Sequence, residues 1–491
     1  MPLDHETFDV IVVGGGPAGS TAAAFVAMQG YRVLLLEREA SPIYKIGESL
    51  LPPTIHGICA MLGVSDEIKN AGFVRKLGGT FQWGKSKEPW TFSWTQSPRF
   101  QTSTSYAYQV ERMKFDLILL NNARRKGVDV RERHRVLGPA LEDGKVAGVE
   151  ILDDAGEHRI VRCSYVIDAS GSTSALARHV SERVGSPFFR NIAVFGYYLN
   201  GKRMPEPCSG NIFCAAFDRG WFWYIPLSPT LTSVGAVIGE EYSDILQQGP
   251  AAALADLIAG CGSIRDMLSN ATRVPEGPYG EVRVRKDYSY CHAKFWRPGL
   301  VVIGDAACFV DPVFSSGVHL ATYSGLLAAR SVNTLLGGSL SEERVFTEFE
   351  RRYRREYTYF HDFLVSFYDM DQDLNSYYWA ARKVTKASGV GHEVFLQLVG
   401  GIAGSGERLY ASDREFIQAL QGIGRRFGPI QDSGDAESHN GVSGPSSLVE
   451  VPLLFADGLI PSRDGFQWTE PRGSKSVHQL LDSGLPVKRA V

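Results

Sequence analysis

The sequence has few cysteines, no long apolar run and no excess of charge of either sign. Its seven cysteines form no Cys-x-x-Cys pair, which argues against a zinc site or a disulfide framework and favours reduced thiols in a cytoplasmic protein. We find neither a bilayer-spanning apolar stretch nor the pattern of a signal peptide, so we expect no stable membrane association. A net charge of −3 gives no reason to expect a nucleic-acid partner.

A glycine-rich stretch near the N-terminus is the clearest motif that the sequence does contain. The β-branched run Val10–Val13 predicts a buried parallel strand, and a helix is predicted over 20–30. Between them, Gly14, Gly16 and Gly19 have the spacing G-x-G-x-x-G. In this pattern the first glycine allows a tight turn, the second lets backbone approach a pyrophosphate, and the third lets the helix pack closely on the strand.

A second predicted strand, over 32–37, completes this unit. It ends at Glu37, 18 residues after Gly19, close to the roughly 20 expected for a carboxylate that binds a ribose. We assign Ala18, in the same turn, to the cofactor site together with the glycines. Because strand, loop, helix, strand and acid follow in order, we interpret the unit as a dinucleotide site rather than a chance glycine-rich turn.

The order of predicted elements indicates one α/β region that a sheet region interrupts. Residues from about 190 to 290 are predicted mostly as strand, and a buried strand at 299–307 returns to the first pattern. The predicted regions are a dinucleotide-binding domain over 1–190 with strands 76–94 inserted, a sheet-based substrate domain over 191–290, the return of the first domain over 291–335, a helical region over 336–430, a flexible linker over 431–447 and a tail over 448–491 without assigned structure.

Three motifs far apart in the sequence resemble those of FAD-dependent enzymes of the para-hydroxybenzoate hydroxylase type. They are Gly14–Gly19, Asp168-Ala-Ser-Gly171 and Gly304-Asp305. The resemblance implies an α/β fold whose Rossmann-like FAD-binding domain is interrupted by a substrate domain, with the acid of the third motif at the ribityl chain. It also implies that Gln109 and Arg112 lie near the flavin. We find no second strand-borne G-x-G-x-x-G for a nicotinamide, so we expect a separate flavin reductase to supply reduced FAD (FADH2).

Two further signatures resemble those of flavin-dependent halogenases. Gly220-Trp-Phe-Trp-Tyr-Ile-Pro226 matches Trp-x-Trp-x-Ile-Pro, and Phe309-Val-Asp-Pro-Val-Phe-Ser-Ser-Gly317 matches Phe-x-x-Pro-x-x-Ser-x-Gly. The resemblance implies that bulky indoles beside the flavin exclude an organic substrate and admit a halide. The alternative for these indoles is a sheet core. The residues assigned to this motif region are Trp221, Trp223, Pro226 and Pro312.

The resemblance also implies a concrete reaction. Reduced FAD and molecular oxygen oxidise chloride or bromide to hypohalous acid, and a lysine presents the halogen to an electron-rich ring. The halide would lie near the backbone of Ser315, Ser316 and Gly317, because a turn of small residues can offer N–H donors. Lys76 occupies the family's lysine position, with Lys45 in the flavin-side loop as its rival. We expect the Lys76 ammonium to be partly desolvated, which favours its neutral form.

The substrate class is suggested by a narrower resemblance, to the chondrochloren-type subgroup that acts on phenol or pyrrole groups carried by a peptidyl or acyl carrier protein. The matching segments are 47–52, 75–81 and 285–290. Tryptophan halogenases carry a glutamate where this chain has Phe314, which disfavours free tryptophan. The basic set Arg351–Arg355 is a weaker indication of an acidic carrier surface, and a solvated helix face is its alternative. The rival functions are an aromatic monooxygenase and an isoprenoid-saturating reductase on the same fold.

Overall fold

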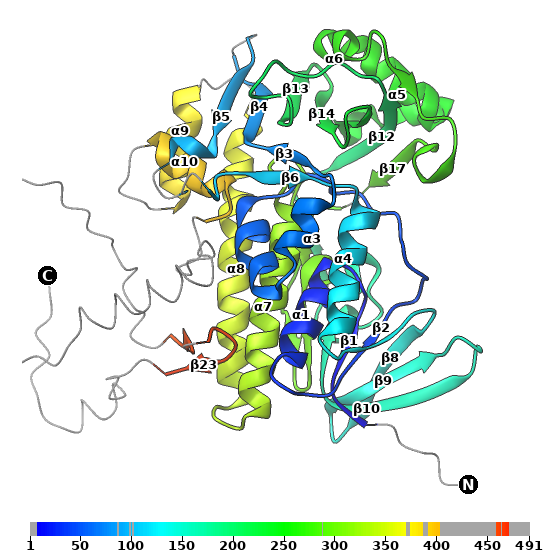
Figure 1. Ribbon diagram of the computed structural model, residues 1–491, viewed down its shortest axis with the longest axis vertical. Coiled ribbons are helices and arrows are strands. Elements are labelled where there is room, and N and C mark those ends of the chain that lie inside the picture. The colour runs from blue at the N-terminus through cyan, green and yellow to red at the C-terminus, as the bar shows by residue number, and fades with distance from the viewer. Residues whose placement is uncertain are drawn as a thin grey trace, which may run out of the picture.

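The computed structural model describes residues 7–85, 88–97, 100, 103–286, 288–369, 374–385, 391–402, 458–462 and 464–470. The chain forms two large sheets, one at the lower right and one at the top of Figure 1, with the longest helices to the left of the first sheet. The predicted linker 431–447 lies outside the described residues, as do the portion of the predicted helical region beyond 402 and most of the predicted tail.

The first sheet is the predicted dinucleotide-binding sheet. Its strand order is β19-β20-β10-β1-β2-β7, and β1 pairs in parallel with both β2 and β10. Val13 is in register with Leu36 and with Asp168, so the carboxyl ends of three strands meet at one edge, where such sheets bind ligands. The strands are β1 (Thr7–Val13), β2 (Val33–Leu36), β7 (Asp129–Arg131), β8 (Arg135–Glu142), β9 (Lys145–Leu152), β10 (His158–Asp168), β19 (Trp296–Arg297) and β20 (Leu300–Val302).

The second sheet has the order β16-β12-β15-β14-β13-β4-β5, with β17 paired to β12. The inserted strands predicted over 76–94 therefore extend the second sheet instead of the first, because β4 pairs in parallel with β13. Gly78 permits the close pairing of β4 with β5 on its other side, since a Cβ there would lie 1.9 Å from the Phe92 carbonyl oxygen. The strands are β4 (Gly78–Gln82), β5 (Trp90–Ser93), β12 (Asn191–Leu199), β13 (Ile212–Phe217), β14 (Gly220–Pro226), β15 (Leu231–Gly239), β16 (Thr272–Arg273) and β17 (Arg283–Lys286).

Short strands and turns join the two sheets. Lys76 ends a strand that pairs with a second short strand, which ends at Gln109. These short strands are β3 (Val74–Lys76), β6 (Ala107–Gln109), β11 (Arg183–Gly185), β18 (Tyr290–His292) and β21 (Cys308–Phe309). The 3-10 turns are Trp94–Gln96, Gly171–Thr173, Ala177–His179, Glu240–Gln248, Gly277–Tyr279 and Gly304–Ala306.

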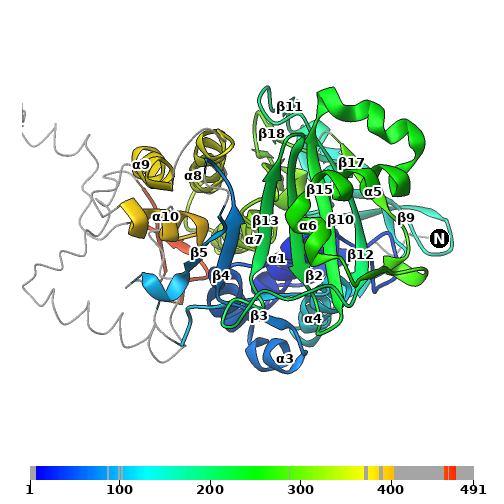
Figure 2. The ribbon, with the colours of Figure 1, turned by 90° about the horizontal axis from the view of Figure 1, so that it is seen from above.

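Helices cover the first sheet and extend beyond it. The helix predicted over 20–30 begins earlier, at Pro17, since proline at the first helical position has its φ already set for a helix. Helices α1, α4 and α7 pack together, and α8 lies beside α7 (Figures 1 and 2). The helices are α1 (Pro17–Ala27), a π-helical segment (Pro53–Cys59), α2 (Ala60–Leu62), α3 (Ser65–Asn70), α4 (Arg112–Arg125), α5 (Pro250–Gly260), α6 (Gly262–Met267), α7 (Ser316–Leu336), α8 (Glu342–Phe367), α9 (Leu374–Thr385) and α10 (Gly391–Val399).

A short hairpin from the predicted tail packs on these helices. Its strands are β22 (Ile460–Pro461) and β23 (Trp468–Thr469). The Trp468 indole is buried and donates to Ser331 Oγ of α7 at 2.9 Å. No periodic pattern in the sequence predicted this hairpin. Among the described residues, no helix is both long and apolar enough to cross a membrane.

Candidate active site

The glycine loop after β1 has the geometry expected of a phosphate-binding turn. Gly14 has a φ of +102°, and a Cβ there would lie 2.5 Å from the Ala169 carbonyl oxygen. A Cβ at Gly19 would lie 1.9 Å from the Gly14 carbonyl oxygen, so only glycine lets α1 approach the turn. A Cβ at Gly16 would meet nothing within 4 Å. Gly16 therefore faces open space, into which a phosphate can come close to the backbone.

A groove beside this loop carries charges of both signs. Gly15 donates its N–H to Glu37 Oε2 at 2.8 Å, which holds the carboxylate at the groove. Lys45 lies in this groove, whereas Lys76 does not line it. The lining residues are Gly15, Gly16, Glu37, Ser41, Pro42, Ile43, Lys45, Met113, Asp116 and Leu117.

The residues expected at the flavin end of the cofactor are Gln109, Arg112 and Asp305. The Arg112 guanidinium makes two bonds of 2.8 Å to Asp116 and donates to the Ile46 carbonyl at 2.6 Å. Burial raises the pKa of Asp305 to about 6, although Arg112 and Lys45 act in the opposite direction. Gln109 is fully buried and donates to the Gly210 carbonyl, while its Oε1 has no hydrogen-bond partner among the described residues.

The described residues fit an FAD molecule. The open space at Gly16 and the Glu37 carboxylate can contact phosphate and ribose in one groove, and the unpartnered Gln109 oxygen is available for a polar contact with the flavin. Ala18 brings the glycine loop close to Gly304, because a Cβ on Gly304 would lie 3.0 Å from the Ala18 Cβ. When bound, FAD would supply the redox chemistry with oxygen. Within the described stretches of the chain, no group of three or more His, Cys, Asp or Glu side chains could hold a metal ion.

Lys76 is buried at the junction of β3 and the second sheet, with 2% of its surface exposed. Its Nζ donates to Ser49 Oγ at 2.8 Å and to the Leu50 carbonyl at 3.1 Å, and lies 3.5 Å from Ser315 Oγ. Burial lowers the pKa of Lys76 to about 7, because the charged form loses its hydration. The expected desolvation of this ammonium is confirmed.

The turn predicted to bind halide, Ser315 to Gly317, lies beside the Lys76 amine, but one of its three N–H groups is already used. Ser315 has a φ of +59° and donates its N–H to the Pro312 carbonyl at 2.9 Å, so that N–H is not available to an anion. Helix α7 begins at Ser316, and the first N–H groups of a helix have no acceptor within it. The N–H groups of Ser316 and Gly317 therefore have no acceptor within the helix and lie at the positive end of its dipole, while their role in binding halide stays a prediction.

The two indoles of the Trp-x-Trp motif form a buried wall of the second sheet. Trp221 donates from Nε1 to the Tyr368 hydroxyl at 2.8 Å, and Trp223 donates to Ser233 Oγ at 3.1 Å. Both are at most 5% exposed. Pro226 ends the same strand. The indoles are thus part of the core of the second sheet. Their predicted position beside a bound flavin, where they would exclude an organic substrate, stays a prediction.

Sequence reasoning did not find a buried acid next to this site. Glu48 is 2% exposed, accepts from the Tyr197 hydroxyl at 2.6 Å, and has no partner for Oε2 among the described residues. Tyr197 is bonded in turn to the Tyr44 hydroxyl at 2.6 Å. Burial raises the pKa of Glu48 to about 7. The only signal in the sequence was its place between Gly47 and Ser49, which carries no information about a tyrosine 149 positions away.

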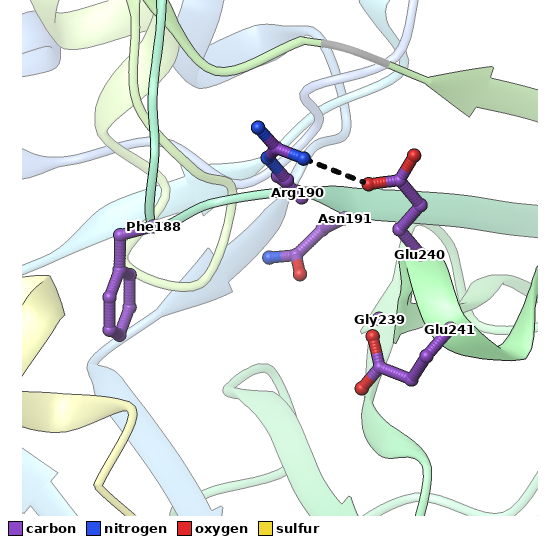
Figure 3. A pocket seen from close by; sticks show the side chains of 6 residues that line it. All are labelled: Phe188, Arg190, Asn191, Gly239, Glu240 and Glu241. Carbon is purple, nitrogen blue, oxygen red and sulfur yellow. Dashed lines mark ion pairs between the residues drawn. The ribbon is translucent and has the colours of Figure 1, made fainter.

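A surface hollow of about 540 Å³ opens where β12 begins and β15 ends (Figure 3). It is lined by Phe188, Arg190, Asn191, Gly239, Glu240 and Glu241, with an ion pair of 3.7 Å between Arg190 and Glu240. Asn191 donates to the same Tyr368 hydroxyl that accepts from the Trp221 indole. The hollow is therefore joined to the indole motif by a chain of hydrogen bonds.

The chain matches the sequence profile of the family described as tryptophan halogenase over residues 9–101 and 95–435. It is 33% identical to the tryptophan 2-halogenase of Chondromyces crocatus, in an alignment that covers 98% of the chain and 91% of that protein. It is also 33% identical to the flavin-dependent halogenase armH4 of Armillaria mellea, over 72% of the chain and 70% of that protein.

Solved structures give the same result. The myxobacterial chondrochloren halogenase CndH, described as a variant of FAD-dependent halogenases, superposes with a TM-score of 0.76 at 51% identity and covers 94% of the chain and 100% of its own. The flavin-dependent brominase Bmp2 superposes with a TM-score of 0.71 at 26% identity, over 86% of the chain and 100% of its own. The predicted α/β FAD-binding fold is confirmed by these neighbours.

Proposed function

The chain belongs to the tryptophan halogenase family and is a flavin-dependent halogenase, and from this premise we propose that it chlorinates or brominates a phenol or pyrrole ring borne by a carrier protein. Flavin-dependent halogenases use FAD with halide and oxygen as co-substrates, and they generally need a separate flavin reductase. Because the chain belongs to this family, we favour halogenation over the two rival functions, aromatic monooxygenation and reduction of isoprenoid chains.

The buried amine of Lys76 is the observation that carries the proposal. A lysine in water is almost entirely protonated at pH 7, whereas a pKa near 7 leaves about half of the amines neutral. A neutral amine can attack the halogen of hypohalous acid, forming an N–halogen bond and releasing water. Its Nζ lies 3.5 Å from Ser315 Oγ, at the turn assigned to the halide.

The FAD-binding roles follow from the groove. We assign the phosphates to Gly14, Gly16 and the start of α1, and a ribose to Glu37, which already lies at the groove. Arg112 and the acid of Gly304-Asp305 are assigned to the ribityl and flavin end. Their opposite charges are near enough for Arg112 to lower the pKa of the acid against the effect of burial.

The nature of the ring is argued from Phe314. This side chain is buried between α8 and the second sheet, stacked on Phe363 at 5.3 Å and close to Phe367 at 4.6 Å. It therefore offers no carboxylate to assist substitution on an indole. A phenol or a pyrrole needs less assistance, because its own heteroatom donates electrons into the ring. One relative is named for tryptophan, so free tryptophan is the alternative substrate that the assay must include.

The involvement of a carrier rests on the subgroup resemblance alone. The basic helix α8 gives it little support, because its arginines are used within the chain. Arg351 and Arg352 both bond to Glu348 at 2.6 to 2.7 Å, and Arg354 bonds to Glu350 at 2.7 Å. A charge that is already paired attracts an acidic partner weakly.

The decisive experiment supplies the purified chain with chemically reduced FAD, oxygen and chloride or bromide. Free phenol and pyrrole acids, free tryptophan, and the same acids on a carrier's phosphopantetheine arm are compared by mass spectrometry of the halogen isotope pattern. We expect halogenated phenol or pyrrole on the carrier. Equal rates for free and loaded acids would remove the carrier, and tryptophan as the best substrate would contradict the ring assignment.

The role of Lys76 is tested by Lys76→Met, with Lys69→Met as the matched control on the exposed face of α3. We expect Lys76→Met to abolish product halogenation while oxygen consumption continues and the oxidant escapes as peroxide or hypohalous acid. The control should halogenate normally. Lys45→Met should weaken FAD binding, since Lys45 lies in the groove. A Lys76 variant that halogenates at the wild-type rate would refute the assignment.

The reductase prediction has its own test. With NADH and FAD but no flavin reductase, turnover should be negligible, because no nicotinamide fingerprint was found in the sequence. Addition of a reductase should restore turnover. Rapid NADH oxidation by the purified chain alone would contradict this prediction.

A further inference from the structure

Two cysteines lie opposite each other on neighbouring antiparallel strands. Cys291 of β18 is in register with Cys308 of β21. The adjacent His292 donates its N–H to the Ala307 carbonyl at 2.9 Å, which marks that pair as the hydrogen-bonded one. The cysteines are therefore a non-hydrogen-bonded pair, whose Cα atoms are about 4.5 Å apart and whose side chains share a face. Disulfides span Cα distances of about 4.4 to 6.8 Å.

The surroundings prepare one of these thiols to react. A hydrogen bond from Cys308 lowers the pKa of Cys291, and Arg354, whose NH1 lies 3.4 Å from its Sγ, acts in the same direction. Burial and Glu350 oppose the shift. Cys308 is 1% exposed, and burial raises its pKa well above the usual value. Cys291 is only partly buried. The pair thus consists of a partly buried thiol whose pKa is lowered and a fully buried thiol that donates a hydrogen bond to it.

The same strands hold the turn that contains Asp305. The Tyr290 hydroxyl donates to the Asp305 carbonyl, and the Tyr353 hydroxyl donates to the Gly304 carbonyl at 3.3 Å. Cys308 follows this turn after two alanines. A covalent bond between the two cysteines would therefore alter the backbone beside the proposed ribityl site.

We propose that Cys291 and Cys308 form a reversible disulfide when peroxide or hypohalous acid escapes from the halogenation reaction. The Cys291 thiolate attacks an oxygen of hydrogen peroxide, which gives a sulfenic acid and hydroxide. The Cys308 thiol then displaces the sulfenic hydroxyl, forming the S–S bond and releasing water. With hypohalous acid, the thiolate takes the halogen and releases hydroxide, and Cys308 displaces halide with loss of its proton. The pair is a modification site that senses the oxidant of its own reaction.

The test treats the FAD-loaded chain with hydrogen peroxide, without halide, and alkylates the remaining thiols in denaturant. Trypsin releases Cys291 in the peptide 287–294 and Cys308 in the peptide 295–330, each with a single cysteine. We expect a cross-link between these peptides that dithiothreitol reverses, and a loss of two of the seven thiols. No halogenation is needed, so failure here is independent of failure of the proposed function.

Two cysteine variants distinguish the first oxidation step from the formation of the disulfide. Cys308→Ser should leave a sulfenic acid on Cys291 that dimedone traps, and Cys291→Ser should give neither product. Cys208→Ser is the matched control, because Cys208 is also partly buried, and it should form the cross-link normally. Oxidation of Cys208 at a dose that leaves the two peptides unlinked would overturn the proposal. A cross-linked chain that binds FAD with unchanged affinity would overturn the coupling to the Asp305 turn.

Discussion

At the scale of single residues, burial changes the acid–base chemistry of two side chains near the site. Lys76 loses hydration and its pKa falls to about 7, whereas Glu48 loses hydration and its pKa rises to about 7. Both shifts favour the neutral form, because a low-dielectric environment disfavours charge of either sign. Neutral Lys76 has the lone pair that the proposed halogen transfer needs, and neutral Glu48 can remain buried without a cation.

The pH dependence of halogenation should follow Lys76. The neutral fraction of a base increases as pH rises through its pKa, so the initial rate should rise about tenfold per pH unit below about 7 and level off above it. The rate is measured with reduced FAD supplied chemically, between about pH 5.5 and 8.5. Glu48 titrates in the same range, so the profile is repeated with Glu48→Gln. If the halogenation rate of Glu48→Gln no longer depends on pH, the pH dependence belongs to Glu48 and not to Lys76.

Glu48 should make the folded chain less stable as pH rises. Its folded pKa is raised from 4.5 to about 7, so between these values the folded state binds more protons than the unfolded state and stability falls with rising pH. The loss is on the order of 1 to 3 kcal/mol. Urea unfolding at about pH 5 and pH 8 should show a smaller decline for Glu48→Gln. The lowered pKa of Lys76 has the opposite effect, because it makes stability increase with rising pH. This increase occurs between about pH 7 and pH 10.5.

At the scale of elements, the glycines of the first loop have different physical tasks. Gly14 and Gly19 are needed for the fold, since added Cβ atoms would overlap backbone oxygen atoms. Gly16 faces open space, and its φ of −72° suits any residue. The motif therefore combines two glycines required by packing with one that packing does not require and that we assign to the phosphate of a ligand.

Gly16→Ala and Gly19→Ala should consequently differ. Gly16→Ala should change the stability of the FAD-free chain by only a few tenths of a kcal/mol, as for glycine replacement at a helix N-cap, but weaken FAD binding at least tenfold. Gly19→Ala should destabilise the chain itself by several kcal/mol, because its Cβ would lie 1.9 Å from a backbone oxygen. Thermal unfolding without FAD and fluorescence titration with FAD measure the two effects. Equal FAD affinity in Gly16→Ala and the wild type would exclude a phosphate there.

At the scale of the whole molecule, the hairpin of β22 and β23 packs against helices that lie more than 100 positions earlier in the sequence. The Trp468 ring is flanked by the guanidinium groups of Arg330 and Arg352, each 4.7 Å from its centroid. It contacts α7 at Ser331, about 22 Å along the helix axis from Ser316. The hairpin therefore stabilises the scaffold at a distance from the proposed chemistry.

Removal of this indole should reduce stability without altering the site. Trp468→Ala should lower the free energy of unfolding by about 3 to 5 kcal/mol, as expected for a buried tryptophan, while Thr469→Ala, its exposed neighbour, should change it by less than about 0.5 kcal/mol. Denaturant unfolding measures both, with halogenation assayed at a temperature where both variants are folded. A loss of halogenation in folded Trp468→Ala would show that the hairpin also acts on the site.

The sequence by itself determined the features that depend on local spacing. The glycines and strand β1 were found because their backbone requirements lie within a short run of consecutive residues. The family followed from short motifs, and the desolvation of Lys76 from its place on a strand. The helix predicted over 20–30 lies three residues earlier in the structure, because Pro17 begins the helix directly after the glycine turn.

Only the tertiary structure decided which distant residues meet. It placed β4 and β5 in the second sheet, paired Ser315 with Pro312, and bonded Glu48 to Tyr197. Lys76 and Ser315 are 239 positions apart, yet Lys76 Nζ lies within 3.5 Å of Ser315 Oγ. Such contacts arise from the packing of whole sheets and helices. Periodicity and spacing report only on neighbours along the chain, so pKa shifts, ion pairs and thiol pairs become visible only once the chain is folded.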